Sequence, residues 1–138
     1  MRRRLLVLLL FLGLPLLSVG AATPASAQTA SSVDVTSVTL VARGAAVEVT
    51  ATVTCEAGST AYLSFVVTQR SGSGIAQGYG YKQIVCTGEP QAVTVLVAAQ
   101  AGGERFRKGT AVVTTYLAVC NPYDCQTTSL SETLQISR

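Results

Sequence analysis

Apolar and polar residues alternate with a period of two along most of the chain after residue 32. The clearest stretch is 46–55, where Val, Ala and Cys alternate with Glu and Thr, and the same pattern recurs in 61–69, 91–98 and 110–120. Because successive side chains of a strand point to opposite faces, each stretch predicts a strand with one buried and one solvated face. No part of the chain after the N-terminal segment has helical periodicity, so we expect an all-β domain.

The alternation also predicts which side chains form the core. We expect these to be Val47, Val49, Ala51, Val53, Cys55, Ala61, Leu63, Phe65, Val67, Val93, Val95, Val97, Ala111, Val113, Leu117 and Val119. The first strand, 33–42, changes parity near Ser37, which predicts a bulge. The last strand, 127–136, has Leu130, Leu134 and Ile136 on its inner face, with Glu132 as an edge charge that opposes aggregation. The glycine-rich stretch 74–86 predicts a strand without fixing its register.

Seven short strands separated by Gly, Pro, Asn and Asp are typical of a sandwich. We therefore expect a two-sheet Greek-key, immunoglobulin-like sandwich over residues 33–138, preceded by a flexible tail at 28–32. The immunoglobulin signature is incomplete, because the chain has no Trp and Tyr116 lies four residues before Cys120 instead of two.

The N-terminus has the three parts of a secretory signal peptide: arginines at 2–4, an apolar run from residue 5 to 12, and Ala-Ser-Ala at 25–27. The apolar segment is almost long enough for a membrane anchor, but glycine, proline and small residues interrupt it. We expect cleavage after residue 27, a secreted extracellular protein, and no membrane association after cleavage.

Charge and composition exclude several classes of function. The net charge of +3 comes from ten Lys and Arg against seven Asp and Glu, and three of the ten are the signal arginines, so the exported chain balances seven against seven. It has no His and no Trp. These features argue against nucleic-acid binding, His-based catalysis and a His-ligated metal. We expect no catalytic residue, no cofactor and no metal site.

The four cysteines, Cys55, Cys86, Cys120 and Cys125, predict two disulfides in an oxidising compartment. We favour Cys55 with Cys86 and Cys120 with Cys125, because the latter pair brackets the turn residues Asn, Pro and Asp and Cys120 lies on the outer face of its strand. The main alternative joins Cys55 to Cys120, a spacing that suits an immunoglobulin-like bridge between sheets.

Three places are candidates for recognition. Tyr123 and Asp124 lie on the turn between Cys120 and Cys125, which would be a preorganised recognition loop or simply the end of a hairpin. Tyr79 and Tyr81 share one face of a strand, as an aromatic platform for a sugar or a protein or as ordinary cross-strand packing. The cationic stretch 104–108 is either an anion site or a solvated loop with Phe106 tucked into the end of the sandwich.

The order and spacing of five segments, 49–55, 78–81, 85–88, 106–113 and 120–125, resemble a group of small exported actinobacterial β-sandwich proteins of uncharacterised function. In that group the first two cysteines recur even where the second pair is missing, which implies the Cys55 to Cys86 bridge. The resemblance implies no activity.

Together these features predict a secreted, non-catalytic binding or structural surface module whose partner is an extracellular protein or glycan. Two alternatives remain open. One is a protease inhibitor that presents the loop between Cys120 and Cys125, and the other is a carbohydrate or small-ligand binder that uses the tyrosine face.

Overall fold

The computed structural model describes residues 30–138, and the expected signal peptide lies outside the described residues. Over residues 30–138 the chain forms seven strands and one short 3-10 helix. In order these are β1 (Ser32–Val41), η1 (Ala42–Gly44), β2 (Ala46–Thr54), β3 (Thr60–Ser71), β4 (Gly74–Val85), β5 (Gln91–Ala99), β6 (Gly109–Cys120) and β7 (Cys125–Ser137). None of the helices described is long and apolar enough to cross a membrane.

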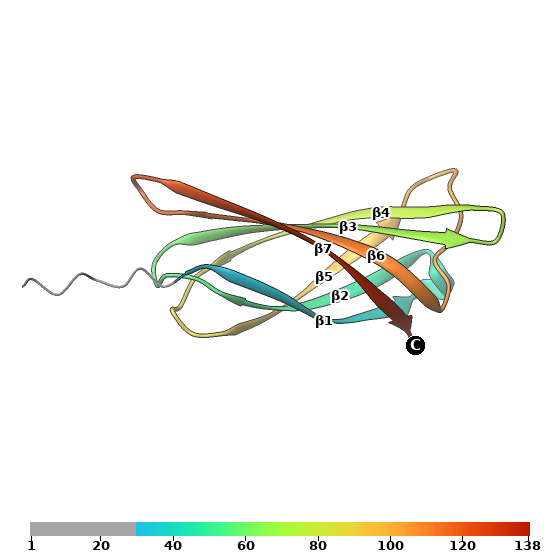
Figure 1. The fold of residues 1–138 in the computed structure, drawn as a ribbon, viewed down its shortest axis with the longest axis horizontal. Coiled ribbons are helices and arrows are strands. Elements are labelled where there is room, and N and C mark those ends of the chain that lie inside the picture. The colour runs from blue at the N-terminus through green and yellow to red at the C-terminus, as the bar shows by residue number, and fades with distance from the viewer. Residues whose placement is uncertain (1–29) are drawn as a thin grey trace, which may run out of the picture.

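The strands close into one barrel in the order β1-β2-β5-β4-β3-β6-β7 (Figure 1). The expected two-sheet, immunoglobulin-like sandwich is therefore wrong. The first and last strands close the barrel by a short parallel pairing, in which Val38 is opposite Ile136 and Thr39 is opposite Ser137. Strands of sandwiches and of barrels show the same alternation of inward and outward residues. The sequence pattern therefore cannot show whether β1 and β7 pair, and here only two residue pairs close the barrel.

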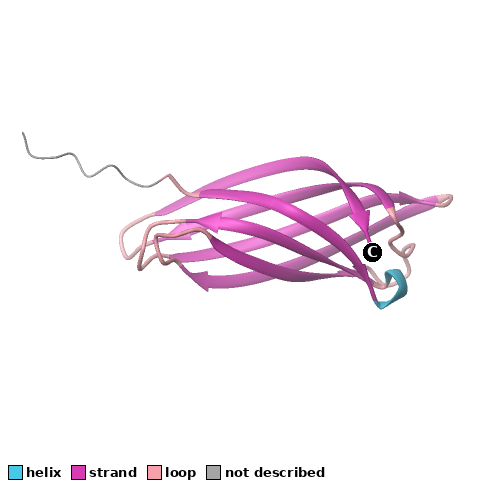
Figure 2. Cartoon of the chain, turned by 90° about the horizontal axis from the view of Figure 1, so that it is seen from below, coloured by secondary structure: helices cyan, strands magenta, loops and turns pink. Residues whose placement is uncertain are grey.

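The barrel is elongated, with loops at both ends and η1 at the end near the C-terminus (Figure 2). The predicted bulge in the first strand is confirmed, because the register between β1 and β2 shifts between Val35 and Ser37. The shift lets Val35 and Val38, three residues apart, both face the interior.

The barrel interior is the hydrophobic core. All the side chains expected in the core are buried, and the largest completely buried ones are Phe65, Phe106, Leu63 and Leu117. The last strand follows the expectation in part: Ile136 is buried and Leu134 half-buried, but Leu130 is 37% exposed.

The glycine-rich strand β4 has a clear register, with Gly78 opposite Ala99 and Tyr79 opposite Ala98 on β5. Gly78 and Gly80 face the interior, and a Cβ on Gly78 would collide with the carbonyl oxygen of Ala98. These glycines therefore let β4 lie close against β5. They do not open the surface around the tyrosines.

The loop between β5 and β6 closes the barrel end near η1. Phe106 is buried there, and its amide donates to the Gly44 carbonyl at 2.9 Å. Gln69 Nε2 donates to the Arg107 carbonyl at 2.8 Å, and Ser71 Oγ donates to the Arg105 carbonyl at 2.7 Å. Phe106 thus plugs this end, as the structural interpretation of the cationic stretch predicted, and the loop carbonyls satisfy two buried polar side chains.

Candidate functional site

Both disulfides lie at the barrel end opposite Phe106. The pairings are Cys55–Cys86 and Cys120–Cys125, as expected, and the alternative bridge from Cys55 to Cys120 is wrong. We define the disulfide end as the start of β1 together with the loops 55–59, 86–90 and 121–124.

The loop between β2 and β3 is held on the end of β4. The amide of Gly58 donates to the Cys86 carbonyl at 2.9 Å, and the amide of Cys86 donates to the Ser59 carbonyl at 2.9 Å. Inside the loop, the Ser59 amide donates to the Glu56 carbonyl at 3.1 Å. With the Cys55–Cys86 bridge, these bonds fix the position of residues 55–59 relative to the barrel.

The turn between β6 and β7 is fixed by one side chain. Asn121 Oδ1 accepts hydrogen bonds from the amides of Tyr123 at 2.9 Å and Asp124 at 2.8 Å. The Asn121 amide donates to the Asp124 carbonyl, and the Cys125 amide donates to Asp124 Oδ1, both at 2.9 Å. Every backbone N–H from Asn121 to Cys125 is therefore bonded within the turn, because Pro122 has none.

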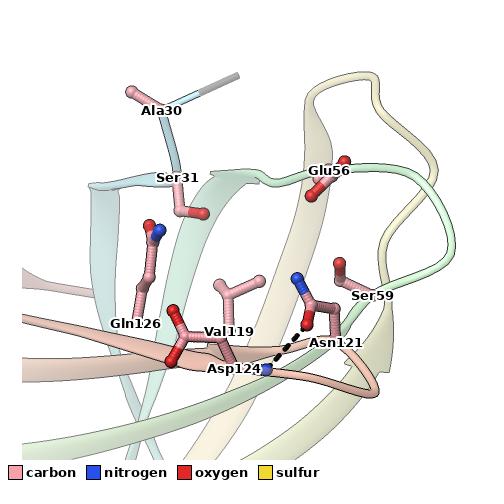
Figure 3. Close-up of a pocket in the computed structure, with 8 residues that line it drawn as sticks. All are labelled: Ala30, Ser31, Glu56, Ser59, Val119, Asn121, Asp124 and Gln126. Atoms are coloured by element: carbon pink, nitrogen blue, oxygen red, sulfur yellow. Dashed lines mark hydrogen bonds between the residues drawn. The ribbon is translucent and has the colours of Figure 1, made fainter. Parts of the chain in front are cut away.

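A cavity of about 240 Å³ lies between this turn, the loop 55–59 and the start of β1 (Figure 3). It is lined by Ala30, Ser31, Glu56, Ser59, Val119, Asn121, Asp124 and Gln126. Figure 3 shows that the polar side chains come from different segments and surround Val119. The lining contains two carboxylates and no Lys or Arg, so it offers mainly hydrogen-bond acceptors, with hydroxyl and amide donors beside them.

A second hollow of about 310 Å³ lies between the loop 55–59 and the turn that carries Tyr123. It is lined by Glu56, Ala57, Gly58, Ser59, Asn121, Pro122 and Tyr123. Glu56, Ser59 and Asn121 line both hollows, so the two form one continuous surface. Tyr123 stands at its edge with 96% of its side chain exposed.

The disulfide end contains two of the four predicted binding residues. Asp124 lines the first cavity and Tyr123 the second. Sequence reasoning missed the contribution of Glu56, Ser59 and Gln126 to the linings. Glu56 and Gln126 each directly follow a cysteine, and that adjacency is the signal that could have placed them at the same end as the bridges.

The other two predicted residues, Tyr79 and Tyr81, lie on the barrel wall. Both point outward from β4 and are 58% and 52% exposed. Tyr81 is opposite Ser64 on β3, which on its other side is opposite Tyr116 on β6. We call Tyr62, Tyr79, Tyr81 and Tyr116 the tyrosine face, because all four lie outward on β3, β4 and β6. The structure thus groups the tyrosines with one another and separates them from the terminal turn.

No metal centre is apparent in the part of the chain that the structure describes, where no group of three or more His, Cys, Asp and Glu side chains is placed to hold an ion. The cationic stretch around Phe106 lies at the opposite end from the two hollows.

Comparison with known proteins identifies no relative, because no protein-family model, no curated protein and no solved structure matches the chain. The resemblance to small exported actinobacterial proteins stays a prediction.

Proposed function

We propose that the protein is a secreted, non-catalytic binding module that recognises an extracellular partner protein with its disulfide end. The observation that carries this proposal is Tyr123, an almost completely exposed aromatic side chain on a turn whose amides are all bonded and whose ends are covalently joined. A rigid turn loses little conformational entropy on binding, and exposed tyrosines are common anchors of protein interfaces.

The surroundings of Tyr123 support the same function. The two hollows, which Glu56 and Asn121 both line, offer acceptors and donors that can orient a partner around the anchor. The exported chain is expected to be charge-balanced, so recognition depends on shape and short-range contacts instead of long-range steering.

The test is capture of a partner from the source culture medium on immobilised protein, followed by affinity measurement with the purified partner. Tyr123→Ala is expected to weaken binding at least about tenfold, as removal of an aromatic anchor does. Tyr116→Ala is the matched control, since Tyr116 is an exposed tyrosine on the barrel wall. Equal affinity of wild type and Tyr123→Ala would contradict the proposal.

A second candidate function is carbohydrate binding by the tyrosine face. The observation that favours it is that Tyr81 and Tyr116 flank the small residue Ser64 across three neighbouring strands, with Tyr62 on the middle strand. Tyrosine rings on a sheet surface can stack on sugars. Because the chain has no Trp, tyrosine fluorescence reports binding directly. Titration with a panel of soluble oligosaccharides should change this fluorescence in the wild type and in Tyr123→Ala. It should not change the fluorescence of Tyr81→Ala. If no sugar changes the fluorescence of the wild type, carbohydrate binding is excluded.

Protease inhibition by the turn is less well supported. Extended inhibitory segments bind by main-chain hydrogen bonds, and here the amides of Tyr123 and Asp124 already bond to Asn121. Assays against a panel of secreted proteases should show no inhibition, and inhibition that disappears in the Cys120→Ser, Cys125→Ser double variant would restore this alternative.

A further inference from the structure

Strand β7 has a long edge with no strand partner in the part of the chain that the structure describes. One edge pairs with β6 along its whole length, from Cys125 opposite Cys120 to Ile136 opposite Gly109. Within residues 30–138 the other edge pairs with β1 only at Ile136 and Ser137. Figure 1 shows the hairpin of β6 and β7 projecting away from β1 toward the disulfide end. The backbone groups on this free edge, from about Cys125 to Thr133, are available to another strand.

The inner face of β7 is also only partly covered along this edge by the part of the chain that the structure describes. Four residues of β7 lie opposite inward-facing residues of β6 and so point inward themselves: Gln126, Thr128, Leu130 and Glu132. Gln126, Thr128 and Leu130 are nevertheless exposed, Leu130 by 37%. The inward residues of β2, β3 and β6 are buried, so the barrel wall lacks cover at this place.

Two buried polar atoms near the same edge have no hydrogen-bond partner among residues 30–138. They are Oγ1 of Thr115, whose side chain is 1% exposed, and Oε2 of Glu132. Thr115 is opposite Leu130, and Glu132 is two residues further along β7, so both atoms lie on the inner side of the uncovered wall. An unpaired buried acceptor is costly, and a donor delivered at the free edge would relieve it.

The neighbouring free edge of β1 is protected. It carries the exposed charge of Asp34 and the bulge between Val35 and Ser37, two devices that oppose strand addition. The stretch from Cys125 to Ser131 has no charge and no proline. Of the two edges, β7 is the one open to a further strand.

We propose that the free edge of β7 pairs antiparallel with β7 of a second copy of this chain, about a twofold axis at Ser129. Ser129 is the centre of the free stretch from Cys125 to Thr133. In this register Thr128 is opposite Leu130 of the second copy, and Gln126 is opposite Glu132 of the second copy. The Gln126 amide then donates to the unpartnered carboxylate, twice by symmetry.

Glu132 sets the register in this arrangement. Identical strands can slide past one another, but a shift that brings the two Glu132 side chains face to face places like charges directly opposite, which is destabilising. The sequence pattern predicted that Glu132 opposes any edge-to-edge association. In the proposed dimer Glu132 instead disfavours the wrong registers and is compatible with the register in which Gln126 lies opposite it.

The experiment is sedimentation equilibrium on the exported chain, residues 28–138, over a range of concentrations. The wild type is expected to dimerise reversibly. Ser129→Lys and Ser129→Glu each place two like charges across the axis, so each alone should raise the dimer dissociation constant at least about tenfold. An equimolar mixture of the two variants should recover dimers, since Lys then faces Glu. Thr52→Lys is the matched control, because Thr52 lies outward on β2, which pairs on both edges, and it should dimerise as the wild type does.

A wild type that stays monomeric at every concentration would overturn the proposal, and so would a Ser129→Lys variant that dimerises as tightly as the wild type. Recovery of dimers in the mixture also shows that both variants are folded. If instead neither variant dimerises alone or mixed while their circular dichroism remains native, the axis does not pass through Ser129 and the proposed pairing is wrong.

Discussion

Asn121 orders the turn between β6 and β7 at the disulfide end. Its Oδ1 accepts hydrogen bonds from the amides of Tyr123, the proposed anchor, and Asp124. The disulfide joins the ends of the turn, but it does not determine how the residues between them are oriented. The side-chain oxygen of Asn121 does so, because it is the common acceptor for both amides.

Replacing Asn121 by Ala should therefore loosen the turn without unfolding the barrel. We expect amide exchange of Tyr123 and Asp124 to accelerate roughly fivefold, which matches the loss of a net hydrogen bond worth about 1 kcal/mol. Asn121→Asp keeps an acceptor oxygen and is the control. Exchange followed by nuclear magnetic resonance measures the effect, and unchanged rates in Asn121→Ala would show that the disulfide alone orders the turn.

Gly78 matters because it has no side chain, which lets β4 lie close against β5. A Cβ here meets the Ala98 carbonyl and a methyl group of Val97. We expect Gly78→Ala to lower the free energy of unfolding by about 1–3 kcal/mol, the usual cost of overpacking. Gly103→Ala, where the nearest atom to the new Cβ is 3.4 Å away, should change it by less than about 0.5 kcal/mol. Urea denaturation compares the two variants, and equal stabilities would mean that β4 moves away from β5 at little cost.

At the scale of elements, period-two alternation placed the strands and most of their inward residues. It succeeded for β2, β3, β5 and β6 because each has one face in the core and the other in solvent. It failed for part of β7, where Leu130 has inward parity but is exposed, since an inward position is buried only when a neighbouring strand covers it. The register of β4 could not be predicted either, because Gly78 and Gly80 contribute no side chains to the alternation of apolar and polar residues.

The two disulfides should contribute unequally to stability. In the chain-entropy account, the Cys55–Cys86 loop of about 32 residues is worth roughly 3.7 kcal/mol and the six-residue Cys120–Cys125 ring about 2.2 kcal/mol. Replacing the first pair by Ser should therefore lower the midpoint of urea unfolding more than replacing the second pair. A larger loss from the second pair would mean that the small ring stabilises the native state by more than chain entropy.

At the scale of the whole molecule, closure of the barrel was the feature that the sequence could not reveal. It depends on the contact of Val38 and Thr39 with Ile136 and Ser137, residues almost a hundred positions apart in the chain. The short loops at the disulfide end were easier to predict from the sequence, because the cysteines mark them directly. The predicted anchor Tyr123 and the cavity residue Asp124 followed from that marking, whereas the facing residues Glu56 and Ser59 required the three-dimensional arrangement.

The central claim is that the disulfide end recognises the partner, and a hydrogen-exchange footprint of the complex tests it most directly. Mass spectrometry of the protein alone and with the captured partner should show slowed exchange in residues 55–59 and 121–126, with exchange in β3, β4 and β6 unchanged around the tyrosine face. Protection confined to residues 62–81 and 114–118, with none in the two loops, would contradict it.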